Sequence, residues 1–127
     1  MIDNDNLAWF VNSYLLVGVG GFVGSILRFT ISEMMQSPQA TFTVNAAGSL
    51  LLGITMAALS SELISKDIAL LLGTGILGAF TTMSTFSVET VELWGQNQIH
   101  AIGYVAITMI ICPLLAFTGW KIGEFIA

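Results

Sequence analysis

Apolar residues dominate four long stretches of this chain, and short polar segments separate the stretches. The apolar stretches cover about residues 9–31, 41–60, 67–94 and 99–120. A helix that crosses a bilayer needs roughly 20 predominantly apolar residues. The pattern therefore predicts four transmembrane helices, short connections between them, and one all-α membrane domain over residues 1–127.

The third stretch is longer than a bilayer requires and contains a cluster of hydroxyl residues. As a continuous helix it would measure roughly 42 Å, whereas the hydrocarbon core is roughly 30 Å thick. Near its centre, the segment TTMSTFS (residues 81–87) holds five hydroxyl side chains and follows glycines at positions 73, 75 and 78. Glycine and threonine are poor helix formers. A helix break near Thr81 and an intact helix whose hydroxyls bond to the preceding turn both stay open.

Composition agrees with an integral membrane protein. Hydrophobic residues make up 55% of the chain and charged residues only 9%, whereas soluble domains carry about 25% charged residues. The mean hydropathy is +0.87. We therefore expect lipid as the surroundings, no nucleic-acid partner and no enzymatic activity. The hydroxyl cluster is the main functional candidate, because polar groups at membrane depth need a partner.

The distribution of basic residues hardly favours either orientation in the membrane. Lysine and arginine usually collect on cytoplasmic loops. With four spans, Lys66 and Lys121 fall on one side and Arg28 falls on the other. This pattern is compatible with a single fixed orientation. It is equally compatible with insertion of copies in both orientations, which then pair antiparallel.

Three polar residues inside the apolar stretches are further candidates, each with two interpretations. Arg28 is either an anchor that reaches the interface or a fixed charge that attracts an anion. Asn45 either bridges helices or donates its amide to an anion. Glu89, the deepest acid, is either an interfacial carboxyl group or part of a proton-coupled pathway.

Two further patterns lie near these residues. Met83 and Phe86 share a helix face, and the positive edge of a phenyl ring can contact an anion. In the fourth stretch, Tyr104, Thr108 and Cys112 recur every four residues and form a weakly polar stripe. Core or lipid packing is the alternative for each of these side chains.

Three motifs in the first three stretches resemble those of the Fluc (CrcB) family of fluoride channels. GGFVGSILR (residues 20–28) looks like the family's GGxxGxxxR pattern, and TFTVNAAGS (residues 41–49) looks like its GTxxVNxxGS pattern. GILGAFTTMSTFSVE (residues 75–89) looks like its long GxxGGxTTFSTFSxE pattern, with Met83 at a phenylalanine position and Ala79 at a glycine position.

The resemblance implies an antiparallel, dual-topology homodimer with two fluoride pores and a third helix that is broken near its centre. It implies a structural sodium ion at the dimer interface, held by the backbone carbonyls of Gly78 and Thr81. The implied task is passive, fluoride-selective export across the plasma (inner) membrane of a bacterium or other microbe, which prevents fluoride toxicity. Some relatives pair two different subunits, so self-pairing stays one of two possibilities.

The same resemblance assigns roles to residues of this chain. Arg28 would lie in an aqueous vestibule, and Cys112 is a weaker candidate on the fourth helix. The implied fluoride pathway consists of Asn45, Met83, Ser84, Thr85, Phe86, Glu89 and Thr108.

Two other functions are weighed against fluoride conduction. A proton-coupled small multidrug transporter also has four short spans, but it needs an acid within its first span, and residues 9–31 contain none. A non-transporting assembly subunit would not need hydroxyls at the membrane midplane. We therefore prefer the fluoride channel.

Overall fold

The computed structural model of the chain describes residues 4–127, so the first three residues of the expected domain lie outside the described part. Within the described part, four helical spans are long and apolar enough to cross a membrane. This confirms the number of spans predicted from the sequence. The spans are Asn4–Met34, Gln39–Ser60, Lys66–Gln96 and Gln98–Ile126.

The first, second and fourth spans are single helices. They are α1 (Asn4–Met34), α2 (Gln39–Ser60) and α6 (Gln98–Ile126). Asn97 begins α6 by accepting hydrogen bonds from the backbone amides of Ile99 (3.0 Å) and His100 (3.2 Å). Such capping satisfies amides that have no partner inside a helix, which is why one helix can follow another after so short a connection.

The third span is built from several pieces. Ser65 caps its start by accepting a hydrogen bond from the Ile68 amide at 3.3 Å. The middle of the span is a π-helix, in which hydrogen bonds join residues five apart. Thr81 and Thr82 are not helical. The pieces in order are α3 (Lys66–Ala69), η1 (Leu70–Leu77), α4 (Gly78–Phe80) and α5 (Met83–Gln96).

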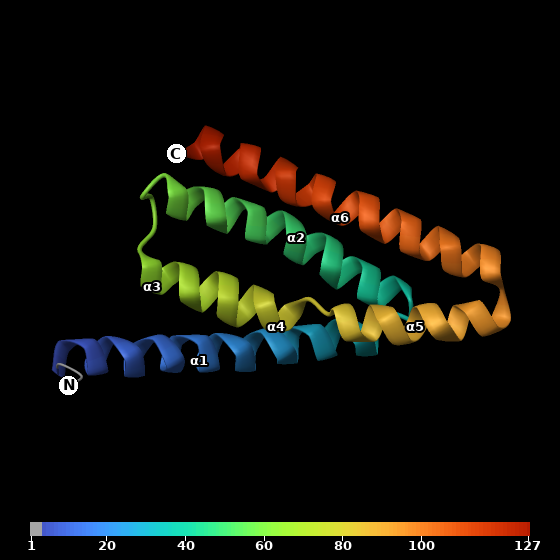
Figure 1. Ribbon diagram of the computed structural model, residues 1–127, viewed down its shortest axis with the longest axis horizontal. Coiled ribbons are helices and arrows are strands. Elements are labelled where there is room, and N and C mark those ends of the chain that lie inside the picture. Colours follow the sequence, from blue (N-terminus) through green and yellow to red (C-terminus); the bar gives the residue numbers. More distant parts are fainter. Residues whose placement is uncertain (1–3) are drawn as a thin grey trace.

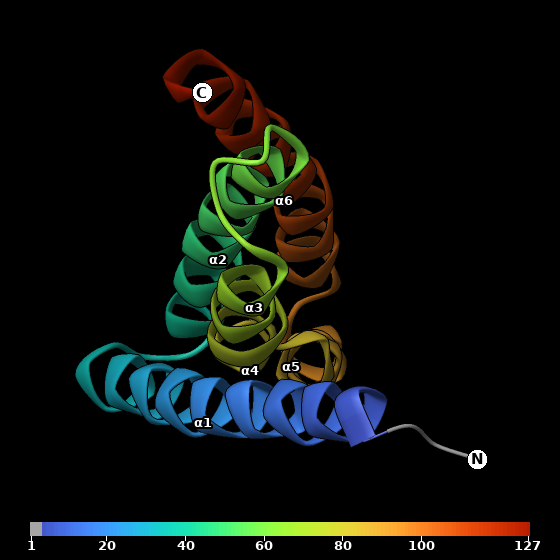
Figure 2. The same cartoon turned by 90° about the vertical axis from the view of Figure 1, so that its left-hand side faces the viewer.

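The spans pack in two pairs, α2 with α6 and α1 with the third span, and α5 of the third span connects the pairs through α6. α2 lies along α6, and α1 contacts η1 and α4, while α5 contacts α6 (Figure 1). The view turned by 90° shows α1 lying across the third span rather than parallel to α2 (Figure 2). The beginning of α1, the end of α6 and the connection from α2 to α3 lie at the same end of the molecule (Figure 1).

Glycines allow these helices to approach closely. A Cβ atom added at Gly53 of α2 would lie 2.2 Å from the carbonyl oxygen of Ala116, and one added at Gly119 of α6 would lie 2.0 Å from that of Leu50. Small residues at helix contacts are typical of membrane proteins, where helices gain little from hiding apolar surface from lipid. Most of the large apolar side chains therefore face outward, and the buried hydrophobic residues are mostly alanines.

Candidate functional site: the break in the third span

The backbone leaves the helical conformation at Thr81 and Thr82. Thr81 has ψ 157°, and Thr82 has φ −150° and ψ 116°, so both residues are extended. In a continuous helix the Thr82 amide would donate to the carbonyl of Gly78, four residues earlier. Here it donates to Asn45 of α2 instead. The predicted break near Thr81 is confirmed, and the intact-helix interpretation is wrong.

The side chain of Asn45 holds the break through two hydrogen bonds to one residue. Its Oδ1 atom accepts from the Thr82 amide at 2.7 Å, and its Nδ2 atom donates to the Thr82 carbonyl at 3.0 Å. A helix-bridging contact, one of the two sequence-based interpretations of Asn45, is therefore present. Because an amide NH2 group has two hydrogens, the second hydrogen is left for another partner.

A hydroxyl cluster surrounds the start of α5. The Oγ1 atom of Thr82 donates a hydrogen bond to the Thr85 hydroxyl at 3.1 Å, accepts one from the Thr85 amide at 3.2 Å and lies 3.2 Å from the Ser84 hydroxyl. Thr82 is buried, whereas Ser84 and Thr85 are exposed on the single chain. Thr82 belongs to the predicted hydroxyl cluster but was assigned no separate role from the sequence, although it contacts both Ser84 and Thr85.

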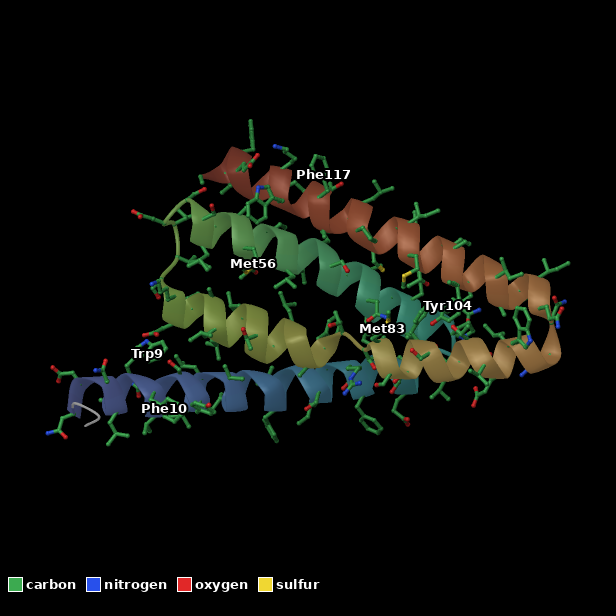
Figure 3. All side chains as sticks on the ribbon, in the orientation of Figure 1. Trp9, Phe10, Met56, Met83, Tyr104 and Phe117 are labelled. Carbon is green, nitrogen blue, oxygen red and sulfur yellow. The ribbon has the colours of Figure 1, made fainter. Side chains whose placement is uncertain are left out.

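A groove of about 350 Å³ lies between α2, the break and α6, and we call it the first groove. Met83 projects into the space between α5 and these two helices (Figure 3). Thr108 is only 3% exposed, and its hydroxyl has no hydrogen-bond partner. Within residues 4–127, no charged residue lines this groove. The lining residues are Asn45, Gly48, Ser49, Leu52, Thr81, Thr82, Met83, Thr108, Met109, Cys112, Pro113 and Ala116.

A second groove, of about 240 Å³, lies between α1, α2 and the start of α5. Arg28 and Thr85 line it, and Thr82 lines both grooves. Among residues 4–127 the one ion pair joins Lys121 to Glu124. The guanidinium group of Arg28 therefore has no acidic partner in the described chain and is available to an anion that enters the second groove.

Glu89 is buried among three hydroxyl groups from other parts of the chain. Its Oε1 atom accepts from Ser37 (2.6 Å) and Thr41 (2.8 Å), and its Oε2 atom accepts from Tyr104 (2.7 Å). Phe86, one turn earlier on α5, packs against the Tyr104 ring with centroids 5.0 Å apart. Hydroxyl donors satisfy a buried carboxyl group without a basic residue.

The structure thus divides the predicted site residues among four places. Asn45, Met83 and Thr108 share the first groove with Cys112, while Arg28 and Thr85 share the second groove. Phe86 and Glu89 are buried between α5 and α6 and line neither groove. The remaining residues lie at the break or next to it: Gly78, Ser84, and Thr81, which also lines the first groove.

Sequence reasoning missed three partners of this site in addition to Thr82. Ser37 and Thr41 were not selected, and Tyr104 was noted only as part of a polar stripe. The available signal was helical spacing, because Thr41 lies one turn before Asn45 and Tyr104 lies one turn before Thr108.

The sequence of this chain is similar to a known protein family and to named proteins of several microbes. The family model described as CrcB-like protein, Camphor Resistance (CrcB), matches residues 15–120. A Bacillus cereus protein named fluoride-specific ion channel FluC 2 is 43% identical over 116 residues, which cover 86% of this chain and 95% of the relative. A protein named fluoride-specific ion channel FluC from Idiomarina loihiensis is 42% identical over 82% of this chain and 86% of its own length. A FluC 2 channel of Halobacterium salinarum is 42% identical over 91% of this chain and 86% of its own length. The chain therefore belongs to the CrcB family.

Proposed function

We propose that this chain is a fluoride-selective channel that lets fluoride leave the cell passively across the plasma membrane and so limits fluoride toxicity. The observation that carries the proposal is the break at Thr81 and Thr82, which gathers hydroxyl and amide donors inside a membrane span. The names of the relatives as fluoride-specific channels support the choice of ion.

The chemistry of fluoride suits such a row of donors. Fluoride is small, strongly hydrated and a strong hydrogen-bond acceptor, so a pore must replace its water with aligned donors. Neutral hydroxyls and amides do this without holding the ion so tightly that it cannot leave. In our proposal Arg28 draws the anion into the second groove, and the ion then passes Asn45, Met83, Ser84, Thr85 and Thr108. Phe86 and Glu89 line neither groove of the single chain, and we propose that they belong to the same pathway in the dimer.

One residue lines both grooves, which supports a continuous route for the ion from one groove to the other. Thr82 lines the first groove and the second groove, and its peptide group is fixed by Asn45. An ion that moves between the grooves therefore passes a backbone that cannot rearrange freely. A fixed, narrow passage favours fluoride over the larger chloride ion.

We further propose that two copies pair in antiparallel orientation and form two pores. Ser84 and Thr85 are exposed on the single chain, and Met83 beside them is 62% exposed. Lipid tails offer no partner for these hydroxyls, whereas a second copy or water held between two copies does. The nearly equal distribution of basic residues on the two sides supports opposite insertion of the two copies.

A sodium ion between the two copies is the last part of the proposal. Because the Thr82 amide donates to Asn45, the carbonyl of Gly78 lacks its usual helical donor, and α4 ends one residue before Thr81. Such free carbonyl oxygens suit a hard cation such as sodium. Replacing sodium with a large organic cation is expected to lower fluoride flux and to weaken dimers in the same samples.

The central test is a flux measurement with purified protein in liposomes. Vesicles loaded with potassium fluoride are diluted into fluoride-free buffer, a membrane potential is set with valinomycin, and efflux is followed with a fluoride electrode. We expect efflux well above that of protein-free vesicles, and no comparable efflux of chloride. Correctly folded dimers that release fluoride no faster than empty vesicles would contradict the proposal.

The same vesicles test the alternative of a proton-coupled multidrug transporter. The acids of α1 are Asp5 and Glu33, which lie at its two ends rather than at membrane depth. We therefore expect no uptake of a lipophilic cation when a pH gradient is imposed. Uptake driven by the gradient, without fluoride efflux, would favour the transporter instead.

A further inference from the structure

Three sulfur-bearing side chains line the first groove. Met83 reaches it from the start of α5, and Met109 and Cys112 reach it from α6. Met109 and Cys112 are three residues apart, so they lie on the same face of their helix. Met56 lies toward the other end of α2, away from Met83 (Figure 3).

Oxygen atoms without partners accompany these sulfurs. The hydroxyl of Thr108, one turn before Cys112, is buried and has no hydrogen-bond partner. Pro113 lies inside α6 and has no amide hydrogen, so the carbonyl of Met109, four residues earlier, lacks its helical donor. Since no Lys or Arg lines the groove, it presents electron-pair donors with no positive charge to repel a cation.

We propose that the first groove is a binding site for a soft monovalent metal cation of the silver(I) or copper(I) class, held by Cys112, Met83 and Met109. Thiolate and thioether ligands select such ions over hard cations. Binding breaks the S–H bond of Cys112, releases its proton to solvent and forms a sulfur–metal bond without any change of oxidation state. The negative thiolate and the positive metal ion cancel, so the groove stays neutral.

In this proposal Thr108 stabilises the bound form of the site. Its hydroxyl lies on the same helix face as Cys112 and is free to donate to the thiolate that forms. The metal would then fill the groove beside Asn45, which also lines it. In the proposed channel, and only if that function holds, the bound metal blocks fluoride.

Direct binding of silver to the purified full chain tests the site. Silver nitrate is titrated into the protein in chloride-free buffer. The heat of binding is measured by calorimetry, and the released protons are counted in the same titration. We expect one silver ion and one proton per chain, and a loss of about tenfold or more in affinity for Cys112→Ser, Met83→Leu and Met109→Leu. Met56→Leu is the matched control, because Met56 lines a different cavity, and it should keep the full affinity.

Two patterns of silver binding among the variants would overturn the proposal. One is saturable binding that Cys112→Ser does not weaken, which would show a different location. The other is binding that depends on Cys112 but is unchanged in both methionine variants, which would show an isolated thiol. Cys112 is the only cysteine of the chain, so no other thiol confuses this comparison.

Flux measurements then separate this proposal from the proposed function. Silver added to active vesicles should stop fluoride efflux, and each variant is compared with its own silver-free rate. Silver binding as expected in a protein that passes no fluoride would refute the channel and keep the metal site. Fluoride flux in a protein that binds no silver would refute the metal site and keep the channel.

Discussion

At the scale of single residues, Asn45 replaces the hydrogen bonds that a continuous helix would supply at the break. Its amide both donates to and accepts from Thr82. Lipid tails cannot form hydrogen bonds with a peptide group, so the hydrogen-bond partners of Thr82 must come from elsewhere, here from the protein. The break in one helix is therefore maintained by a residue of another helix.

Asn45→Ala tests this role. It leaves the amide and the carbonyl of Thr82 unpaired, and each unpaired buried group costs about 1–3 kcal/mol. We expect the free energy of unfolding to fall by about 2–4 kcal/mol, measured by circular dichroism during titration with sodium dodecyl sulfate in mixed micelles. Asn12→Ala, on an exposed position of α1, should leave it unchanged. Equal stabilities of the two variants would contradict the bracing role.

Tyr104→Phe tests the hydroxyl groups around Glu89. It removes the 2.7 Å hydrogen bond to Oε2 and keeps the ring contact with Phe86. Hydrogen bonds between membrane helices contribute modestly, so we expect a loss of about 1 kcal/mol in the same titration. Tyr14→Phe is the control, since Tyr14 is 66% exposed. A cost as large for Tyr14→Phe as for Tyr104→Phe would count against a specific contact.

Some residues of the site could be identified from the sequence and others could not, for a physical reason. Asn45 and Glu89 stand out because amide and carboxyl groups are costly within an apolar stretch. The roles of Thr41 and Thr82 could not be assigned in this way, because a threonine hydroxyl can bond to the preceding turn of its own helix at any depth. Only the packing of α2 and α6 against α5 decides which threonines reach Glu89 or Asn45.

At the scale of elements, glycines fix how α1 meets the third span. A Cβ atom at Gly20 would lie 2.5 Å from the Leu71 carbonyl oxygen, and one at Gly24 would lie 2.0 Å from that of Ile76. Both carbonyls belong to the π-helix η1, which is wider than an α-helix. Close contact with this segment therefore requires residues without a side chain.

Gly24→Ala is expected to push α1 away from η1. Overpacking of this kind lowers the free energy of unfolding by about 1–3 kcal/mol. Here the added methyl group would clash with backbone atoms, which cannot adopt another rotamer. Gly21→Ala is the matched control, because a Cβ atom there meets nothing within 4 Å. Size-exclusion profiles and unfolding titrations of the two variants give the comparison. Similar behaviour of both would contradict the packing argument.

The elements were predictable to different degrees. Hydropathy located the four spans because bilayer thickness fixes the length of each apolar stretch. Glycines followed by threonines indicated the break. The π-helix was not predicted, because its hydrogen bonds differ from those of an α-helix by one residue in register and change no apolar pattern.

At the scale of the whole molecule, the positions of the basic residues affect how the protein is oriented in the membrane. Lys66 begins α3 and Lys121 lies near the end of α6, so both lie at the end of the molecule that holds the start of α1. Arg28 lies toward the opposite end. Such a slight difference should be easy to override with added lysines.

Two variants with opposite charge bias test antiparallel pairing. Gln96→Lys with Gln98→Lys adds charge at one end, and Ser60→Lys with Ser61→Lys adds it at the other; all four positions are exposed. Each variant produced alone should lose fluoride efflux from cells, because its copies share one orientation. Production of both together should restore efflux. Full efflux from either variant alone would contradict the antiparallel dimer.

The interruption of the third span also creates a pair of opposite partial charges near the middle of that span. The peptide dipoles of η1 and α4 end in electronegative carbonyl groups at Phe80, while those of α5 begin with electropositive amides at Met83. A few residues of neutral backbone can thus attract a cation on one side and an anion on the other. A chain with only three basic residues in this way gains ion-attracting ends that no change of pH can remove.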